Sequence, residues 1–280
     1  MTAVTVLGLG PMGSALTSAF VATGHPTTAW SRTPATPTPP GATRATTPAE
    51  AVAASELAII CVRGDAAVAS VLGGLDLTGR TLVNLTSGTP AQARARAAEA
   101  AGHDYLAGAI MTPTPTVGTP AALVLYSGPE AVHRKWADTL AALGGTARYL
   151  GTDPGRASAY DVALLDMFWQ SVSGIVHGLA LARAEGISGA ELAPYGATMA
   201  GLLPDMVARF GEQLDAGSYP GTVSTIASAE AGLAHIADAA RERGIDADAL
   251  VAGLRVIRRA IEDGHGADGL ARLADVLGGV

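Results

Sequence analysis

The sequence predicts an α/β fold in the N-terminal half of the chain, followed by one long helix and an all-helical C-terminal part. Up to about residue 150, short β-branched and aliphatic runs alternate with helical patterns, which is typical of a mainly parallel sheet covered by helices on both faces. Beyond Gly155 only helical patterns follow. Hydrophobic residues make up 49% of the 280 positions, which is enough for a buried core and excludes a mainly disordered chain.

The expected strands are short runs of β-branched, aliphatic or aromatic residues bounded by glycine, proline or polar residues. They are Ala3–Leu7, Thr27–Trp30, Leu57–Val62, Thr81–Leu85, a strand within His103–Met111, Ala122–Tyr126 and Ala147–Leu150. The helical patterns between them are Ser14–Ala22, Thr89–Ala101 and Glu130–Leu143. The segment Thr33–Pro48 contains five prolines, which remove amide donors and restrict their neighbours, so we expect a loop there.

A single helix is expected from Ala157 to Glu185, because this stretch has no proline and only one glycine before Gly178. Its length of roughly 43 Å, at 1.5 Å per residue, exceeds what a globular core needs, so the helix leaves the first domain. We therefore expect domains at 1–153 and 154–280. Further helices are expected at Leu192–Leu214, which Pro204 kinks or splits, and at Thr225–Arg243, Ala247–Glu262 and Gly269–Leu277.

Charge and cysteine content argue against several classes of protein. A net charge of −7 disfavours nucleic-acid binding, which normally needs a basic face. The single cysteine fits a reducing compartment, and no basic region precedes the first apolar run, so we expect a soluble, cytoplasmic protein without a signal peptide. The longest apolar runs are far shorter than a membrane span, and no His, Cys and Asp cluster has the spacing of metal ligands.

A glycine-rich turn follows the first expected strand. Gly8, Gly10 and Gly13 have dinucleotide-binding spacing, in which the first allows a tight turn, the second lets backbone approach a pyrophosphate and the third lets helix and strand pack closely. The helix start supplies free N–H groups and a positive dipole end. Its place between a strand and a helix favours a nucleotide site over an ordinary turn. The cofactor contacts expected here are Gly8, Leu9, Gly10, Pro11 and Met12.

The end of the second expected strand indicates which nucleotide binds. An NAD site usually has Asp or Glu about 20 residues further on, bonded to the ribose 2′-OH, but this chain has no carboxylate before Glu50. Arg32, between Ser31 and Thr33, instead offers a planar charged fork and flanking hydroxyls that match a phosphate. We therefore expect NADPH, with Arg32, Ser31 and Thr33 at the 2′-phosphate. The alternative is a solvated surface arginine.

Further cofactor contacts are expected where the third and fourth strands end, since ligands of such sheets bind at the carboxyl ends of the strands. The residues there are Cys61, Val62, Arg63, Asn84 and Thr86. Arg63 either faces a phosphate or is solvated. Cys61 is interpreted as a small buried apolar residue, because no neighbour would stabilise its thiolate.

Five stretches match the pattern of one enzyme family. They are Gly8–Gly13 with Trp30–Pro34, Val83–Pro90, Gly108–Gly128, Tyr149–Leu165 and, more weakly, Gly264–Gly266. With them the chain resembles the imine reductases, including the reductive aminases, over nearly its whole length. This resemblance implies an N-terminal Rossmann domain, a long interdomain helix and a helical C-terminal domain, with NADPH as cofactor and a small-molecule imine as substrate. It also implies a homodimer with exchanged helical domains, so that both chains build the active-site cleft.

The position of the only lysine distinguishes two kinds of chemistry. The β-hydroxyacid dehydrogenases, the nearest relatives by fold, use a lysine early on the interdomain helix as acid and base, as the resemblance implies. Here that helix has no lysine, and Lys135 lies before it, on an expected helix of the nucleotide domain. An iminium carbon is already electrophilic and needs only a hydride, an orientation and stabilisation of its cation.

Asp161, in the first turns of the long helix, is the expected catalytic residue. A carboxylate there stabilises a cation by Coulomb attraction, and the resemblance implies a position that binds substrate or amine. The alternative is a carboxylate that complements the helix dipole. Trp169 lies roughly 80° and Asp166 roughly 140° around the helix from Asp161, so Trp169 borders the same cleft. The proton source stays open among Asp161, Tyr160, water and, least favoured, Asp166.

Substrate contacts are expected at Ser87, Trp169, Met111 and Met199. Ser87 stands where the resemblance places an asparagine in some reductive aminases, and its alternative is a turn serine. Trp169 replaces a tyrosine or aspartate of family members, and because indole does not titrate it is interpreted as a pocket wall or a core aromatic. The two methionines are otherwise core residues. We therefore predict NADPH-dependent reduction of imines. The alternatives are an NADP-dependent hydroxyacid-type dehydrogenase and an NADP-binding protein without turnover.

Overall fold

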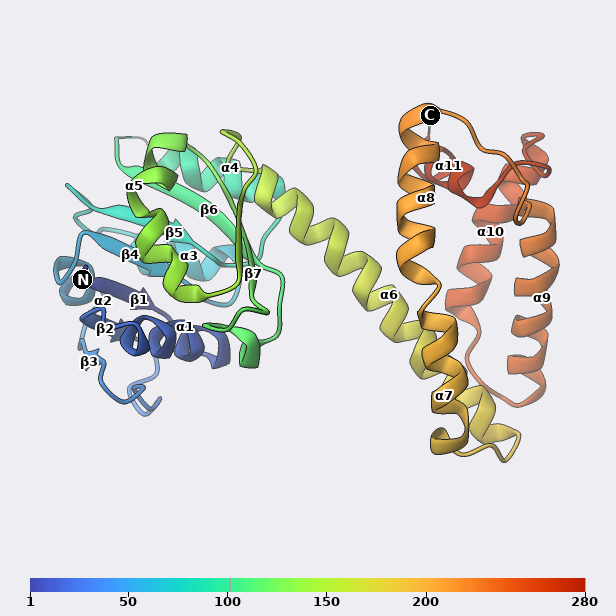
Figure 1. Ribbon diagram of the computed structural model, residues 1–280, viewed down its shortest axis with the longest axis horizontal. Coiled ribbons are helices and arrows are strands. Elements are labelled where there is room, and N and C mark those ends of the chain that lie inside the picture. Colours follow the sequence, from blue (N-terminus) through green and yellow to red (C-terminus); the bar gives the residue numbers. More distant parts are fainter. Residues whose placement is uncertain (101, 280) are drawn as a thin grey trace. The chain divides into compact units, whose positions relative to one another are not determined.

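The computed structural model describes residues 1–100 and 102–279. They form two compact units, Met1–Phe168 and the residues from Trp169 onward, and helix α6 (Arg156–Ala184) contributes to both (Figure 1). The first unit is an α/β domain and the second is helical, which confirms the predicted fold class. Two positions within the predicted elements and domains, Ala101 and Val280, lie outside the described residues.

The first unit is built on one sheet with the strand order β3-β2-β1-β4-β5-β6-β7-β8 in the described residues. Neighbouring strands run parallel except β6 and β7, so the sheet is mainly parallel as predicted. Strands β1, β4 and β5 are buried along their whole length, which explains their near-continuous apolar sequences. The strands are β1 Val4–Leu7, β2 Thr27–Trp30, β3 Thr43–Arg44, β4 Leu57–Ile60, β5 Thr81–Asn84, β6 Asp104–Ile110, β7 Leu123–Ser127 and β8 Thr146–Tyr149.

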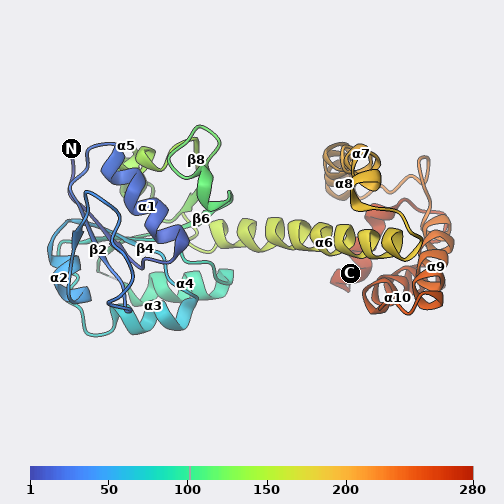
Figure 2. The ribbon, with the colours of Figure 1, turned by 90° about the horizontal axis from the view of Figure 1, so that it is seen from below.

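Helices cover both faces of this sheet (Figure 2). On one face, α1 and α5 bury Phe20 and Trp136 in a core cluster with β1, β4 and β7. On the other face, α2, α3 and α4 bury Val52, Val68 and Ala93 in a second cluster. The helices are α1 Pro11–Ala22, α2 Pro48–Ala53, α3 Asp65–Leu72, α4 Pro90–Glu99 and α5 Glu130–Leu140.

Two α-helices and one strand of the first unit are absent from the sequence-based prediction. Helices α2 and α3 span only six and eight residues and are rich in alanine, so their apolar pattern is too short to be recognised. Strand β3 lies inside Thr33–Pro48, which is predicted to be a loop. Its two residues carry no alternation of their own, and the strand exists because it pairs with β2. No other helix or strand lies between Thr33 and Thr47.

The strand order reverses at β1, which has β2 on one side and β4 on the other. In an open parallel sheet, ligands bind outside the carboxyl ends of the strands at such a reversal. Gly8 follows β1 directly, Cys61 follows β4 and Leu85 follows β5, so these three connections share one edge of the sheet.

Helix α6 extends over 29 residues, as predicted from its lack of proline. The elements that follow are α7 Gly189–Ala200, α8 Leu203–Ala216, α9 Ile226–Glu242, α10 Asp248–Glu262 and α11 Leu273–Gly278. Pro204 lies in the first turn of α8 and so splits the predicted helix Leu192–Leu214. Within this unit α9 and α10 pack together around Ala237, Ala240 and Leu254.

Candidate active site

The turn after β1 requires glycine at two of its three glycine positions. Gly8 has a φ of +111°, and a Cβ there would lie 2.0 Å from the carbonyl oxygen of Cys61. A Cβ on Gly13 would lie 2.0 Å from the carbonyl oxygen of Gly8. Gly10 is different, because its φ is −65° and a Cβ there would meet no atom within 4 Å. Gly8 and Gly13 therefore serve packing, whereas Gly10 leaves space open at the start of α1.

The N-terminus of α1 fits a nucleotide pyrophosphate. Gly10 is its N-cap residue and forms no side-chain cap, Pro11 stands in the first turn, and that turn has no acidic residue. Free N–H groups and the positive end of the helix dipole attract an anion, and the missing Cβ of Gly10 lets it approach the backbone. Gly8 to Met12 thus span the turn and the start of α1, and their contact with the cofactor stays a prediction.

Gly13→Ala should destabilise the fold, and Gly10→Ala should not. The new methyl group at position 13 would collide with the Gly8 carbonyl, so we expect a loss of about 3 kcal/mol in the free energy of unfolding, the upper end of the usual cost of overpacking. The methyl group at position 10 meets open space, so we expect unchanged stability and weaker NADPH binding. Urea denaturation and fluorescence titration with NADPH measure the two effects. Equal stability of both variants would contradict this division of roles.

The end of β2 presents an arginine, Arg32, that has no carboxylate partner in the described part of the chain. Arg32 and Thr33 are exposed, and Ser31 is half-buried with its hydroxyl 3.5 Å from Oγ1 of Thr36. Across residues 1–100 and 102–279, no ion pair involves Arg32. An uncompensated guanidinium between two hydroxyl side chains fits a phosphate monoester.

The connections after β4 and β5 are tied to each other. The Val62 amide donates a hydrogen bond to Oγ1 of Thr86 at 3.2 Å. Arg63 is exposed, and Cys61 is half-buried between the core and the glycine turn. Burial raises the pKa of the Cys61 thiol to about 11, so the thiolate is scarce at neutral pH and the residue is no nucleophile.

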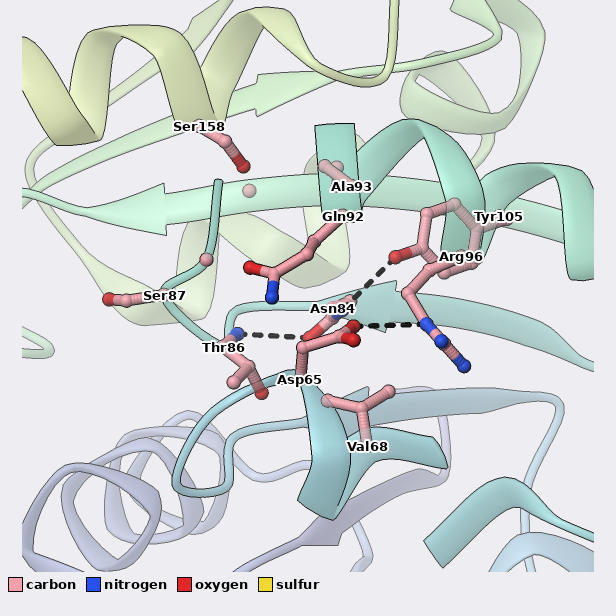
Figure 3. A pocket seen from close by; sticks show the side chains of 13 residues that line it. Asp65, Val68, Asn84, Thr86, Ser87, Gln92, Ala93, Arg96, Tyr105 and Ser158 are labelled. Carbon is pink, nitrogen blue, oxygen red and sulfur yellow. Dashed lines mark hydrogen bonds and ion pairs between the residues drawn. The ribbon is translucent and has the colours of Figure 1, made fainter. Parts of the chain in front are cut away.

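A buried polar network holds the loop after β5 (Figure 3). The Asn84 amide donates to the Tyr105 hydroxyl at 3.0 Å, while its carbonyl oxygen accepts from the Thr86 amide at 3.0 Å. Tyr105 and Asn84 meet because Asn84 lies opposite Ala107 in the β5–β6 register, two residues along from Tyr105 on the same face of the sheet. Asn84, predicted to be a cofactor contact, therefore has both ends of its amide engaged within the protein.

Tyr105→Phe should weaken this network without removing a residue from the cofactor turn. The change leaves the buried Asn84 amide without its acceptor, so we expect a loss of about 1–3 kcal/mol in stability and a several-fold higher KM for NADPH. Tyr149→Phe is the matched control, because the Tyr149 hydroxyl donates to the Gly128 carbonyl at 2.8 Å on the edge strand β8. If both variants have the same KM for NADPH, the network does not support the cofactor loop.

Asp161 lies in the second turn of α6, with only 3% of its surface exposed. The side chain of Ser87, in the loop after β5, favours the ionised form of this carboxyl group. Burial outweighs this effect and raises the pKa of Asp161 above its ordinary value. The structure thus brings the predicted catalytic residue and one predicted substrate contact together at the edge where the strands end.

Three contacts fix the start of α6 on the first unit. The Ser127 hydroxyl accepts from the Ala157 amide at 3.0 Å and donates to the Pro154 carbonyl at 3.1 Å. Arg94, on α4, forms two hydrogen bonds of 2.9 and 2.8 Å with Asp153, which lower the pKa of Asp153 to about 2. Because α4 directly follows the Ser87 loop, these contacts hold Asp161 and Ser87 in register.

Of the other predicted substrate residues, one lies in the first unit and two lie in the second. Met111 is half-buried and packs against Ala109, Leu125 and Ala157. Trp169 and Met199 are exposed residues of the second unit, and their role in the site stays a prediction. Residues that sequence reasoning missed are Tyr105, Ser158, Asp65 and Arg96 around the cavity of Figure 3, where Arg96 pairs with Asp65 at 2.9 Å. Of these four residues only Tyr105 could have been noticed in the sequence, because a tyrosine inside a strand expected to be buried needs a hydrogen-bond partner for its hydroxyl.

No metal-binding group and no membrane-spanning helix is found in the part of the chain that the structure describes. Three or more His, Cys, Asp or Glu side chains nowhere gather there as a metal would require. No described helix is both long and apolar enough to cross a bilayer.

Comparison with known proteins identifies relatives along the whole chain. Residues 153–279 match the family described as NADPH-dependent reductive aminase-like, C-terminal domain, and residues 3–151 match the NAD binding domain of 6-phosphogluconate dehydrogenase. The chain is 33% identical to an NADPH-dependent reductive aminase from Aspergillus oryzae, covering 96% of this chain and 95% of the relative.

Solved structures agree with these matches. A reductive aminase from Aspergillus terreus in complex with NADPH and ethyl levulinate is 35% identical, with a TM-score of 0.92 over 98% of this chain and 99% of that one. An imine reductase from Myxococcus stipitatus in complex with NADP+ is 34% identical, with a TM-score of 0.93 over the same shares of the two chains. The chain therefore belongs to the family of imine reductases and reductive aminases.

Proposed function

We propose that this chain is an NADPH-dependent imine reductase that transfers hydride to the carbon of a C=N bond and releases an amine. One observation carries the proposal: a buried carboxyl group, Asp161, lies beside the Ser87 loop at the edge of the sheet where the nucleotide-binding turn begins. The similarity to imine reductases and reductive aminases over both domains supports it.

NADPH, when bound, supplies the hydride. The turn from Gly8 to Met12 would hold its pyrophosphate, as the open space at Gly10 and the uncapped start of α1 suggest. Arg32, Ser31 and Thr33 would hold the 2′-phosphate. The remaining predicted contacts, at the ends of β4 and β5, would border the nicotinamide side, and they are Cys61, Val62, Arg63 and Thr86.

Asp161 would stabilise the positive charge on the C=N nitrogen. A carboxylate removed from water attracts a nearby cation more strongly than an exposed one does. The cation in turn favours ionisation of Asp161, because an opposite charge lowers a carboxyl pKa. Binding of a protonated imine and ionisation of Asp161 are therefore coupled.

The only lysine lies at the wrong edge of the sheet for the alternative chemistry of a hydroxyacid dehydrogenase. The Lys135 ammonium is 2.6 Å from a carboxylate oxygen of Glu56 and 3.3 Å from one of Asp104. Glu56 precedes β4 and Asp104 begins β6, so Lys135 is bound at the amino ends of these strands. The nucleotide turn lies at their carboxyl ends.

The second unit supports a homodimer with exchanged helical domains. Within the described chain, α7 and α8 bury none of their residues. The large exposed apolar side chains of these helices and of the turn between them are Tyr195, Met199, Leu202, Leu203, Val207 and Leu214. Such a surface needs a partner, and a second copy would also complete a small-molecule cleft. Light scattering should give twice the mass of one chain.

The single half-buried cysteine supports a cytoplasmic location.

A spectrophotometric assay tests the proposed function. NADPH oxidation is followed with a panel of cyclic imines, and NADP+ reduction with small 3-hydroxy acids. We expect turnover with imines only. Comparable turnover of 3-hydroxy acids would instead establish a dehydrogenase, and tight NADPH binding without oxidation by any imine would establish a nucleotide-binding protein.

A further inference from the structure

Arg44 cross-links the proline-rich segment after β2. It stands on the edge strand β3, opposite Ala29 of β2. One end of its guanidinium, Nη1, donates to the Thr36 carbonyl at 3.2 Å and to Oγ1 of Thr38 at 3.5 Å. The other end, Nη2, donates to the carbonyls of Ser31 and Thr33 at 3.1 and 3.2 Å.

These four hydrogen bonds replace a secondary structure that the segment cannot form. Prolines at positions 34, 37, 39 and 40 have no amide donor, so neither a helix nor a strand ladder is available there. The segment forms few hydrogen bonds within itself. In one of them the Thr36 amide donates to the Thr33 carbonyl at 3.1 Å. The Arg44 fork therefore sets the shape of the turn from Ser31 to Thr38.

The contacts of Arg44 enclose Arg32 on both sides. The carbonyls bound by Nη2 belong to the residues immediately before and after Arg32, so the backbone at Arg32 is fixed while its side chain stays exposed. A bidentate clamp on flanking carbonyls limits the directions in which the Arg32 guanidinium can point.

Within the described residues, both arginines lack an acidic partner. The sequence has no Asp or Glu before Glu50, and the Glu50 carboxylate accepts hydrogen bonds from the amide and hydroxyl of Thr46. Among residues 1–100 and 102–279 no ion pair involves Arg44 or Arg32. Two uncompensated guanidinium groups on one short segment attract the doubly charged 2′-phosphate of NADPH more strongly than the neutral 2′-hydroxyl of NADH.

We propose that Arg44 is a positioning residue that determines the preference for NADPH over NADH, acting through the turn that carries Arg32. The inference rests on the proposed function, since it assigns the coenzyme 2′-phosphate to Arg32. Arg44 uses its guanidinium on the protein, and Arg32 keeps its own for the ligand.

Calorimetric titration with 2′,5′-ADP and 5′-AMP tests the proposal without catalysis. Arg44→Ala should weaken 2′,5′-ADP binding by about tenfold, equivalent to about 1.4 kcal/mol, and leave 5′-AMP binding unchanged. In steady-state assays the KM for NADPH should rise by the same factor while kcat at saturating NADPH stays constant. Arg44→Lys keeps the charge but loses the two-ended fork, so it should not restore binding.

Arg80→Ala is the matched control. Arg80 also donates from both ends of its guanidinium to two backbone carbonyls, those of Ser55 and Ala53, at 3.0 and 3.3 Å, but at the amino end of β5. Arg80→Ala should leave the ratio of the affinities for 2′,5′-ADP and 5′-AMP unchanged. If Arg44→Ala does not fold, as judged by circular dichroism, Arg44→Gln takes its place.

The outcomes separate this proposal from the cofactor assignment. Equal weakening of 2′,5′-ADP and 5′-AMP by Arg44→Ala, or full recovery in Arg44→Lys, overturns the positioning role. Loss of 2′,5′-ADP binding in Arg32→Ala but not in Arg44→Ala also overturns it, and leaves the 2′-phosphate assignment standing. If neither variant changes 2′,5′-ADP binding, the assignment of the phosphate to Arg32 has failed.

Discussion

Asp161→Asn is expected to lower kcat for imine reduction by about 10²–10³-fold, the usual effect of removing one group that stabilises developing charge. The NADPH dissociation constant should stay unchanged, because Asp161 lies on α6 and not on the nucleotide turn. Asparagine has the size of aspartate, so the variant removes charge without opening a cavity. Single-turnover absorbance measurements at saturating NADPH isolate the chemical step.

The pH dependence provides an independent readout of the same residue. Burial raises the pKa of Asp161 above the ordinary 3.8, and ionised Asp161 is the active form, so wild-type kcat/KM should fall as the pH drops through the raised pKa. The acidic limb should disappear in Asp161→Asn. A rise in activity as the pH drops through this range would instead show that the protonated acid is required.

The free energy of unfolding should change with pH in the direction opposite to kcat/KM. The folded protein holds the Asp161 proton more tightly than the unfolded chain, so this group stabilises the fold at low pH and that contribution is lost as the pH rises from 3.8 through the raised pKa. At neutral pH Asp161→Asn should therefore be at least as stable as the wild type.

Asp166→Asn, which changes an exposed residue of the same helix, is the control for the effect on kcat. If it lowers kcat as much as Asp161→Asn, the assignment to Asp161 is wrong.

Arg32→Ala is expected to raise the KM for NADPH by about 10- to 100-fold and the KM for NADH by less than about twofold. The range corresponds to about 1.5–3 kcal/mol for hydrogen bonds to a charged group. The selectivity should follow because only NADPH carries the 2′-phosphate and no nearby carboxylate replaces the interaction. Steady-state kinetics with both coenzymes measure the ratio.

Two controls separate loss of the 2′-phosphate contact from a general loss of positive charge. Arg63→Ala, at the end of β4, should leave the NADPH-to-NADH ratio unchanged, whether Arg63 faces a phosphate common to both coenzymes or is solvated. Added salt should reduce the wild-type preference for NADPH, because exposed charges are screened. Equal effects of Arg32→Ala on both coenzymes would remove the 2′-phosphate assignment.

The sequence alone determined the features that depend on neighbours along the chain or on an absent residue type. The spacing of Gly8, Gly10 and Gly13 after an apolar run predicted the nucleotide turn, and a stretch without proline predicted α6. The chain has no carboxylate before Glu50 and no lysine on α6, and both facts are visible in the sequence alone. Such features follow from local conformation and composition, so they can be read directly.

Only the tertiary structure decided which side chains meet. Strand order and register bring Tyr105 to Asn84, and the anchored start of α6 brings Asp161 to Ser87. β3 and its Arg44 clamp, inside a segment predicted to be a loop, exist because an edge strand pairs with β2. Hydrogen bonds and burial depend on distances between residues far apart in the chain, and these distances are set by how the sheet and helices pack, which no local pattern encodes.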